Sequence, residues 1–257
     1  MKVLVACEYS GRVRDAFRAA GHDAWSCDLL PCDADPEWHI QGDVVPLLGQ
    51  GWDLMVAHPP CTYLCSSGLH WNKRVPGRQA KTEQALDFVR TLLSCPIPQV
   101  AIENPVGCIS TRIRKPDQTI QPWQFGHDAS KATCLWLKNL PLLKAESSNV
   151  IAPKGYQLVR GSWEMSECVD CGEPFCDLHQ NHYADCGCIG PTEDEVEYLD
   201  IAGFSFATRQ SPAPRPVWAN QTPSGQNKLG PSPDRWKIRS ETYQGIATAF
   251  AQQWGIL

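Results

Sequence analysis

Cys61 is the residue of this chain that is best placed to act as a nucleophile. It follows an apolar run from Leu54 to Ala57 and two prolines, Pro59 and Pro60. A short apolar run is typical of a buried, parallel strand, whereas prolines fix φ and cannot donate a hydrogen bond to a strand ladder. The chain should therefore leave the sheet at the prolines and present Cys61 at the carboxyl edge, where open parallel sheets bind ligands.

Inert burial is the alternative for Cys61, because the chain contains 13 cysteines and free cysteine is among the most buried residue types. We favour the nucleophile, since binding and catalytic groups gather on loops. Glu103 supports this interpretation. It closes the next strand pattern, Gln99 to Asn104, so we expect it to face the same cleft as Cys61. A solvated glutamate at a loop end is the plainer alternative.

The first strand and turn predict a nucleoside site. Lys2 to Ala6 is typical of a strand, the loop Cys7 to Gly11 contains one glycine, and a helix from about Arg12 to Ala20 should end at Gly21. Such a turn lets a ligand approach backbone amides at a helix N-terminus. An ordinary strand-to-helix turn would fit the residues equally well.

Two aspartates strengthen the nucleoside interpretation. Asp28 follows a second predicted strand, Ala24 to Cys27, and lies about 20 residues past the first turn, where an acid commonly binds ribose hydroxyls. Asp43 could close a third strand and accept a hydrogen bond from an adenine amino group. Either aspartate could instead cap a loop or a helix.

Two helices should cover the sheet. Arg78 to Ser94 has an apolar stripe, with Lys81 and Thr82 outside it. The tail predicts a helix with Ser240 as N-cap and Glu241 in its first turn. The expected stripes are Ala85, Leu86, Val89, Leu92 and Leu93 in the first helix, and Ile246, Ala247, Phe250, Ala251 and Trp254 in the second.

The composition is that of an ordinary soluble globular protein. Of 257 residues, 42% are hydrophobic and 20% are charged, and no apolar run approaches the roughly 18 residues that a membrane helix needs. The apolar run before Glu8 is too short for a signal peptide, so we expect a reducing, cytoplasmic location and no membrane partner. With a net charge of -5, nucleic-acid binding would need local basic patches.

A cysteine-rich segment predicts a structural zinc site. Its candidate ligands are Cys168, Cys171, Cys186 and Cys188, in a Cys-x-x-Cys and a Cys-x-Cys pair. Four thiolates are typical of closed, tetrahedral zinc sites, and a redox dithiol is the alternative. Three more potential ligands could replace one of these or form a second site: Cys176, His179 and His182.

From 208 to 233 the chain is rich in Pro, Ser, Gly, Asn and Gln, which predicts an extended loop. Its flank carries basic residues, and three amide side chains lie near them. These groups could contact phosphates and base edges, although a solvated loop is an equal alternative. They are Lys228, Arg235, Lys237, Arg239, Asn220, Gln221 and Gln226.

The Pro59-Pro60-Cys61 motif, with Cys65 and Gly68 at matching spacing, resembles the nucleophile motif of the S-adenosylmethionine-dependent cytosine carbon-5 DNA methyltransferases. Within this family, the chain resembles the compact phage-type members. Glu103-Asn104-Pro105 resembles the Glu-Asn-Val motif of that family, with proline in place of valine. The resemblance covers most of residues 1–140 and the C-terminal tail. It implies an α/β fold with a Rossmann-like methyltransferase sheet.

The resemblance also implies roles for individual residues. Lys131, after Phe125-Gly126, stands where the family has an arginine, with Arg112 and Arg114 as rival candidates. The implied catalytic residues are Cys61, Glu103 and Lys131. The implied S-adenosylmethionine-binding residues are Glu8, Tyr9, Gly11, Asp28, Asp43, Pro59 and Gly245, with Ile246 where the family has an asparagine.

The expected activity is methylation of cytosine carbon 5 in DNA, through a covalent adduct of Cys61 with carbon 6. Residues 1–140 plus 236–257 should form the catalytic domain, and 141–235 a small zinc-binding, target-recognition region. The same chemistry on RNA, on a free cytosine nucleotide or with a modified S-adenosylmethionine remains an alternative. So does a noncatalytic zinc-ribbon DNA-binding protein on a degenerate scaffold. A zinc deaminase is excluded, because its His-x-Glu signature does not occur.

Overall fold

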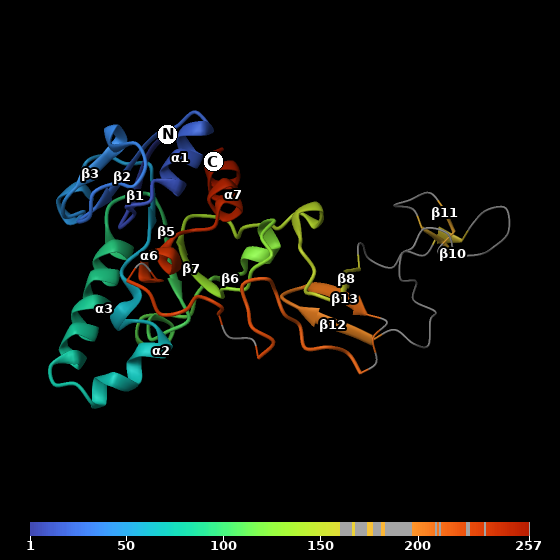
Figure 1. The fold of residues 1–257 in the computed structure, drawn as a ribbon. Helices are drawn as coiled ribbons and strands as arrows, with labels where there is room; N and C mark the ends of the chain where they lie inside the picture. Colours follow the sequence, from blue (N-terminus) through green and yellow to red (C-terminus); the bar gives the residue numbers. More distant parts are fainter. Residues whose placement is uncertain are drawn as a thin grey trace.

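The computed structural model describes residues 1–159, 197–208, 210, 212–224, 227–233 and 235–256, together with the backbone of three short strands at 166–167, 174–176 and 181–182. Figure 1 shows a large sheet with helices packed on it, and a smaller group of strands beside it. Within the described ranges, no helix has the length and hydropathy that a membrane crossing requires.

A seven-stranded sheet forms the centre of the molecule. Its strands follow the order β3-β2-β1-β4-β5-β7-β6, and β7 runs antiparallel to both of its neighbours. Chain order reverses between β1 and β4, which is the point at which open sheets of this kind bind ligands. The architecture is a mixed α/β fold consistent with a Rossmann-like methyltransferase. The strands are β1 (Lys2–Ala6), β2 (Asp23–Asp28), β3 (His39–Gln41), β4 (Leu54–Ala57), β5 (Gln99–Pro105), β6 (Gln118–Ile120) and β7 (Thr133–Lys138).

Helices cover both faces of this sheet. Helix α3 (Arg78–Ser94) packs on one face, and α1 (Arg12–Ala19) and α7 (Gln244–Trp254) pack side by side on the other. The shorter helices are α2 (Ser66–Leu69), α4 (Ile109–Arg112) and α6 (Arg235–Ser240). The 3-10 helices are η1 (Pro36–Trp38), η2 (Val45–Leu47), η3 (Cys61–Tyr63), η4 (His70–Lys73), η5 (Pro122–Phe125) and η6 (Ser147–Asn149).

Most of the elements predicted from the apolar patterns are confirmed, and three details differ. Thr82 was expected outside the stripe of α3 but is 2% exposed, because its hydroxyl donates to the carbonyl of Tyr63. Ser240 ends α6 instead of capping the tail helix, which begins at Gln244. β3 ends at Gln41, so Asp43 follows that strand at a distance of two residues. The predicted buried stripe of the tail helix is confirmed.

A smaller antiparallel sheet lies beside the large one. It consists of β12 (Glu197–Ile201), β13 (Phe204–Thr208) and β8 (Gln157–Leu158), in that order. The indole rings of Trp123 and Trp218 stack at 5.6 Å in its core. This core also holds Val150, Tyr156 and Phe206, so the region buries more apolar surface than its cysteine-rich sequence suggests. Three further short strands pair with one another: β9 (Ser166–Glu167), β10 (Pro174–Cys176) and β11 (Asn181–His182).

The predicted zinc ligands Cys168, Cys171, Cys186 and Cys188 lie outside the described residues. Among the residues that are described, no group of three His, Cys, Asp or Glu side chains is arranged to hold a metal ion.

Candidate active site

Cys61 lies where the chain leaves β4 at the carboxyl edge of the sheet. The strand ends at Ala57, Pro60 is extended with φ -53° and ψ 121°, and Cys61 is the first residue of η3. Because prolines cannot continue a ladder, the backbone turns here as the sequence predicts. The Cys61 side chain is half-buried on this turn.

A second thiol, that of Cys65, forms a hydrogen bond with Cys61. This hydrogen bond, together with burial, raises the pKa of Cys61, whereas the same hydrogen bond lowers the pKa of Cys65. The Ser67 hydroxyl, 3.2 Å from Cys65 Sγ, and the charge of Arg239 also favour a thiolate at Cys65. The pair therefore releases a first proton readily and retains the second. Cys65 is therefore the thiolate of the pair, and the Cys61 thiol donates a hydrogen bond to it.

The turn of Cys61 is joined to the loop that follows β5. The Cys108 N–H donates to the Leu64 carbonyl at 2.8 Å, and Cys65 and Gly107 form a β-bridge. Only glycine allows this approach, since a Cβ at Gly107 would overlap the Leu64 carbonyl oxygen. Cys61 and the strand end that carries Glu103 are thereby held as one unit.

Glu103 is a buried side chain, 8% exposed, and it is paired with His58. His58 Nδ1 lies 2.9 Å from Glu103 Oε2, because Ala57 pairs with Ile102 and the next residues of the two strands lie side by side. Burial alone would raise the pKa of Glu103. The hydrogen bond with His58 and the charge of Lys131 outweigh burial and lower the pKa of this carboxyl below its ordinary value.

Asn104 connects β5 to the turn that carries Cys61 by a second hydrogen bond. Its side chain is 1% exposed, and Nδ2 donates to the carbonyl oxygen of Pro59 at 2.7 Å. Pro59 itself is buried. Its position is therefore explained by support of the turn that carries Cys61, and its predicted contact with a cofactor stays a prediction.

Lys131 lies in the loop before β7 and acts electrostatically on both catalytic candidates. Its charge lowers the pKa of Cys61 and that of Glu103, although other contributions leave the Cys61 value raised. The structure thus brings Lys131 to the same edge as Cys61 and Glu103. The two rival arginines form ion pairs elsewhere, Arg112 with Glu83 and Arg114 with Asp117.

Glu8 is used as a cap for α1. Its carboxylate accepts hydrogen bonds from the backbone N–H groups of Val13 at 2.7 Å and Arg14 at 3.2 Å, and it is buried. Burial raises the pKa of Glu8 despite these hydrogen bonds. The sequence left two alternatives for these amides, approach by a ligand or an ordinary strand-to-helix turn. In the structure Glu8 satisfies two of them, and its predicted contact with a cofactor stays a prediction.

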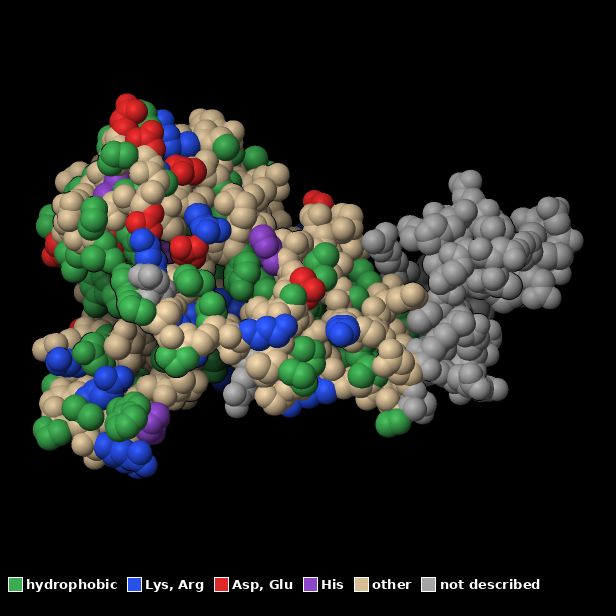
Figure 2. Space-filling model, in the orientation of Figure 1, with side chains coloured by type: hydrophobic (Ala, Val, Ile, Leu, Met, Phe, Trp, Pro, Cys, Tyr) green, Lys and Arg blue, Asp and Glu red, His purple; other side chains and the backbone are tan. Residues whose placement is uncertain are grey.

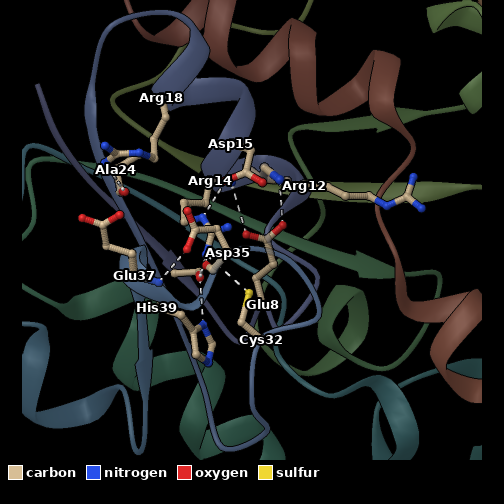
Figure 3. A network of polar contacts seen from close by, with 12 residues as sticks. Glu8, Arg12, Arg14, Asp15, Arg18, Ala24, Cys32, Asp35, Glu37 and His39 are labelled. Atoms are coloured by element: carbon tan, nitrogen blue, oxygen red, sulfur yellow. Dashed lines mark hydrogen bonds and ion pairs between the residues drawn. The ribbon is translucent and has the colours of Figure 1, made fainter.

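Figure 3 shows how the loop after β2 is fixed next to this cap. Arg14 is fully buried, and its Nη1 donates to Ser26 Oγ, Cys32 Sγ and the carbonyl oxygen of Asp35, at 3.3, 3.4 and 2.9 Å. Gly11 caps α1 with a φ of 74°, and a Cβ there would lie 3.0 Å from Ala34 Cβ. Glycine is needed at this turn for both its backbone angle and its small size.

Helix α6 lies over the side chain of Tyr9. The Tyr9 hydroxyl donates to the carbonyl of Lys237 at 3.0 Å, and its ring is 5.9 Å from that of Trp236. An ion pair of 2.6 Å between Lys237 and Asp33 closes the same contact. Tyr9 therefore holds α6 on the loop between β1 and α1 through its side chain.

Asp28 and Asp43 flank the beginning of this loop. Asp28 ends β2 and is half-buried, Asp43 is exposed, and both raise the pKa of Cys7, for which burial is the larger cause. Cys7 has a φ of 59°, a strained conformation that non-glycine residues rarely adopt and that is frequent at functional sites. Each aspartate also accepts a backbone hydrogen bond, Asp28 from Leu30 and Asp43 from Val45.

Gly245 is explained by packing. A Cβ at this position would overlap the carbonyl oxygen of Phe125, and the Gly245 N–H donates to His127 Nε2 at 2.8 Å. This close contact docks the start of α7 on η5.

Sequence reasoning missed His58 as a member of the site, and it missed the thiol pair. His58 is one residue beyond the buried strand, and Cys65 is four residues beyond Cys61. A signal existed for both, since residues at the carboxyl end of a central strand face the edge where ligands bind.

Comparison with known proteins identifies no family. No protein-family model matches the chain, and no curated protein matches it. Among solved structures, a protein from an E. coli prophage, described as a candidate DNA modification methyltransferase, is similar over 52% of this chain and 45% of its own, with 14% identity and a TM-score of 0.35. The chain thus spans less than half the length of that protein.

Proposed function

We propose that this protein methylates carbon 5 of cytosine in DNA, with S-adenosylmethionine as the methyl donor. One observation carries the proposal. The thiol of Cys61 and the buried carboxyl of Glu103 lie at the ends of adjacent strands, and the charge of Lys131 lowers the pKa of both groups. This edge lies at the switch point of the sheet.

The residues fit the chemistry that carbon 5 requires. This carbon is a poor nucleophile until a thiolate adds at carbon 6 of the ring. The Cys65 thiolate takes the proton of Cys61 while the Cys61 sulfur bonds to carbon 6, because that proton becomes more acidic as the bond forms. Glu103 donates a hydrogen bond or a proton at the ring nitrogen where negative charge develops. After methylation, carbon 5 loses its proton to water and Cys61 leaves as a thiolate, which restores the aromatic ring. Cys61 then takes back its proton from Cys65.

The donor groups at the amino-terminal half of the sheet fit the nucleoside part of S-adenosylmethionine. Asp28 and Asp43 are carboxylates on either side of the strained Cys7, suited to ribose hydroxyls and to the adenine amino group. Bound there, S-adenosylmethionine would supply an electrophilic methyl group. Glu8 and Gly11 would support the conformation of the loop. The Glu8 carboxylate is bonded to α1, and Arg14 of α1 occupies the space beside Gly11.

The segment around Cys61 favours a polyanionic substrate. Residues 54–82, which we call the basic arm, contain no acidic residue and four basic ones, although the whole chain has a net charge of -5. Lys73 and Arg74 are exposed at its tip, where Trp71 is 45% exposed and lies under the Arg74 guanidinium. Figure 2 shows Lys, Arg, His and hydrophobic side chains close together at this end of the molecule. A basic surface with an exposed aromatic ring suits a nucleic-acid strand.

Neutralising the basic arm should weaken DNA binding in a salt-dependent way. For Lys73→Gln or Arg74→Gln, we expect the slope of log K against log salt to fall by about one, because each residue releases about one counterion from DNA. Fluorescence anisotropy with labelled duplex DNA at several salt concentrations measures the slope. Lys144→Gln, an exposed lysine whose backbone is bonded to α7, is the matched control and should leave the slope unchanged. Equal slopes for all variants would contradict DNA contact by this arm.

The proposed reaction is tested by mass analysis of the base. The protein is incubated with S-adenosylmethionine and, in parallel, duplex DNA, single-stranded DNA, RNA or deoxycytidine nucleotides. We expect 5-methylcytosine in DNA. Product only in RNA or nucleotide would change the substrate, a larger added mass would change the donor, and an unmodified base in every reaction would reject the proposal.

We also propose that residues 141–235 recognise the target and that zinc at Cys168, Cys171, Cys186 and Cys188 stabilises part of this region. A Cys168→Ser/Cys171→Ser double variant should lose bound zinc and show a lower melting temperature. Cys95→Ser, at the end of α3, is the control. Metal analysis that finds no zinc in the unaltered protein, or an unchanged amount in the double variant, would reject the zinc site.

A further inference from the structure

His58 is a histidine with a largely buried side chain, and the chemistry of Cys61 and Glu103 leaves it unexplained. Its side chain is 9% exposed, its Nδ1 lies 2.9 Å from Glu103 Oε2, and its Nε2 is buried without a hydrogen-bond partner among the described residues. Burial of an imidazole with one orphaned nitrogen costs free energy, so the pair needs a reason beyond packing.

Charged and polar groups surround this pair. The groups that face it are Glu8 from the loop after β1, Cys61 from η3, Lys131 from the loop before β7, and Thr133 and Cys134 from β7. Glu8 interacts favourably with a positive His58, and Lys131 with a negative Glu103. The pair is therefore joined by one hydrogen bond and lies between a second carboxylate, Glu8, and the ammonium group of Lys131.

That arrangement creates a difficulty for Glu103 acting alone. The hydrogen bond with His58 and the charge of Lys131 hold its pKa below its ordinary value, so the carboxyl itself is ionised near neutral pH and has no proton of its own to donate to a base. A proton on the neighbouring imidazole removes the difficulty. An imidazole ordinarily titrates roughly two pH units above a glutamate carboxyl, so a histidine–glutamate pair keeps one proton to higher pH than glutamate alone.

We infer that His58 is a positioning residue that supplies Glu103 with the proton it delivers to the ring nitrogen of the bound cytosine. As the Cys61 sulfur bonds to carbon 6, an electron pair of the ring shifts toward N3. N3 then takes a proton from Glu103, and Glu103 takes the proton of His58 Nδ1. When Cys61 leaves, the N3–H bond breaks and the proton returns by the same route, so the pair ends in its starting state. The inference rests on the proposed function.

The test is the pH dependence of methyl transfer in single turnover, with saturating S-adenosylmethionine and the substrate that the unaltered protein modifies. His58→Asn is the informative variant, because an asparagine amide can occupy the position of Nδ1 and still donate a hydrogen bond to Glu103, but cannot release a proton. We expect its rate at pH 7.5 to fall at least about tenfold, and the alkaline limb of the profile to move at least about one pH unit toward acid. Binding of S-adenosylmethionine should be unchanged.

Controls separate this role from simple support of the fold. His22→Asn alters a histidine just before β2, at the amino edge of the sheet, and should leave the profile unchanged. Circular dichroism and the melting temperature show whether His58→Asn folds, and His58→Gln serves as a second variant if it does not. A profile of unaltered shape, with the rate lowered equally at every pH, would show that His58 only supports Glu103 and would overturn the inference. Absence of transfer by the unaltered protein to any substrate would overturn the proposed function instead, and the inference with it.

Discussion

Replacing Cys61 with serine should lower the single-turnover rate of methyl transfer at least about a thousandfold, because a serine hydroxyl is a far weaker nucleophile than a thiolate and has the same position. Asp28 and Asp43, which we propose to bind S-adenosylmethionine, lie at or after the ends of other strands, so its binding, measured by calorimetry, should be retained. Transfer of a labelled methyl group to DNA gives the rate.

A covalent trap strengthens this test. With 5-fluorocytosine in the DNA, the fluorine cannot leave carbon 5 as a proton does, so the Cys61 adduct should persist and shift the mass of the unaltered protein. Cys61→Ser should form no adduct. Cys95→Ser removes a buried thiol at the far end of α3 and should form it normally. A Cys61→Ser protein that transfers methyl groups at the unaltered rate would show that the thiol is not the nucleophile.

The turn that presents Cys61 was predictable because its causes are local. Leu54 to Ala57 is apolar throughout and forms β4 with the predicted bounds, and the two prolines end the strand where their chemistry requires. Helix α3 likewise has the predicted bounds. In such segments, the residues that determine the structure are neighbours in sequence.

The pairing of His58 with Glu103 was not predictable in the same way. It depends on the register in which Ala57 lies opposite Ile102, and strand register is a property of the assembled sheet. Thr82 shows the same limit. Its position on α3 looks peripheral in the sequence, and its burial results from the Tyr63 carbonyl, 19 residues earlier, which is folded back over the helix.

Glu8 shows how a correct local pattern can have a different use. A strand, a turn with one glycine and a helix do follow one another as predicted. Between them, however, the Glu8 carboxylate accepts hydrogen bonds from the first turn of α1. These helix amides can be satisfied either by a side chain of the protein or by a ligand. Composition and spacing do not predict which of the two partners binds the amides, because both present anionic oxygens.

Gly107→Ala should be the most damaging small substitution at this edge of the sheet. A Cβ there would overlap the Leu64 carbonyl oxygen and lie 2.8 Å from Cys65 Cα, and both are backbone atoms that cannot rotate away. The loop after β5 must therefore separate from the turn of Cys61. We expect a loss of about 3 kcal/mol in the free energy of unfolding, and a melting temperature lower by roughly 6–12 °C.

The effect on activity should exceed the effect on folding, because the same contact sets the distance between Cys61 and Glu103. At a temperature where Gly107→Ala is fully folded by circular dichroism, we expect methyl transfer at least about a hundredfold slower, since a displacement of about 1 Å at a reacting group costs that much. Gly49→Ala is the matched control, because no atom lies within 4 Å of its added Cβ, and it should keep both stability and rate. If Gly107→Ala were as stable and as active as Gly49→Ala, the two loops would not be held in this contact, and the joining of Cys61 to Glu103 through the backbone would be wrong.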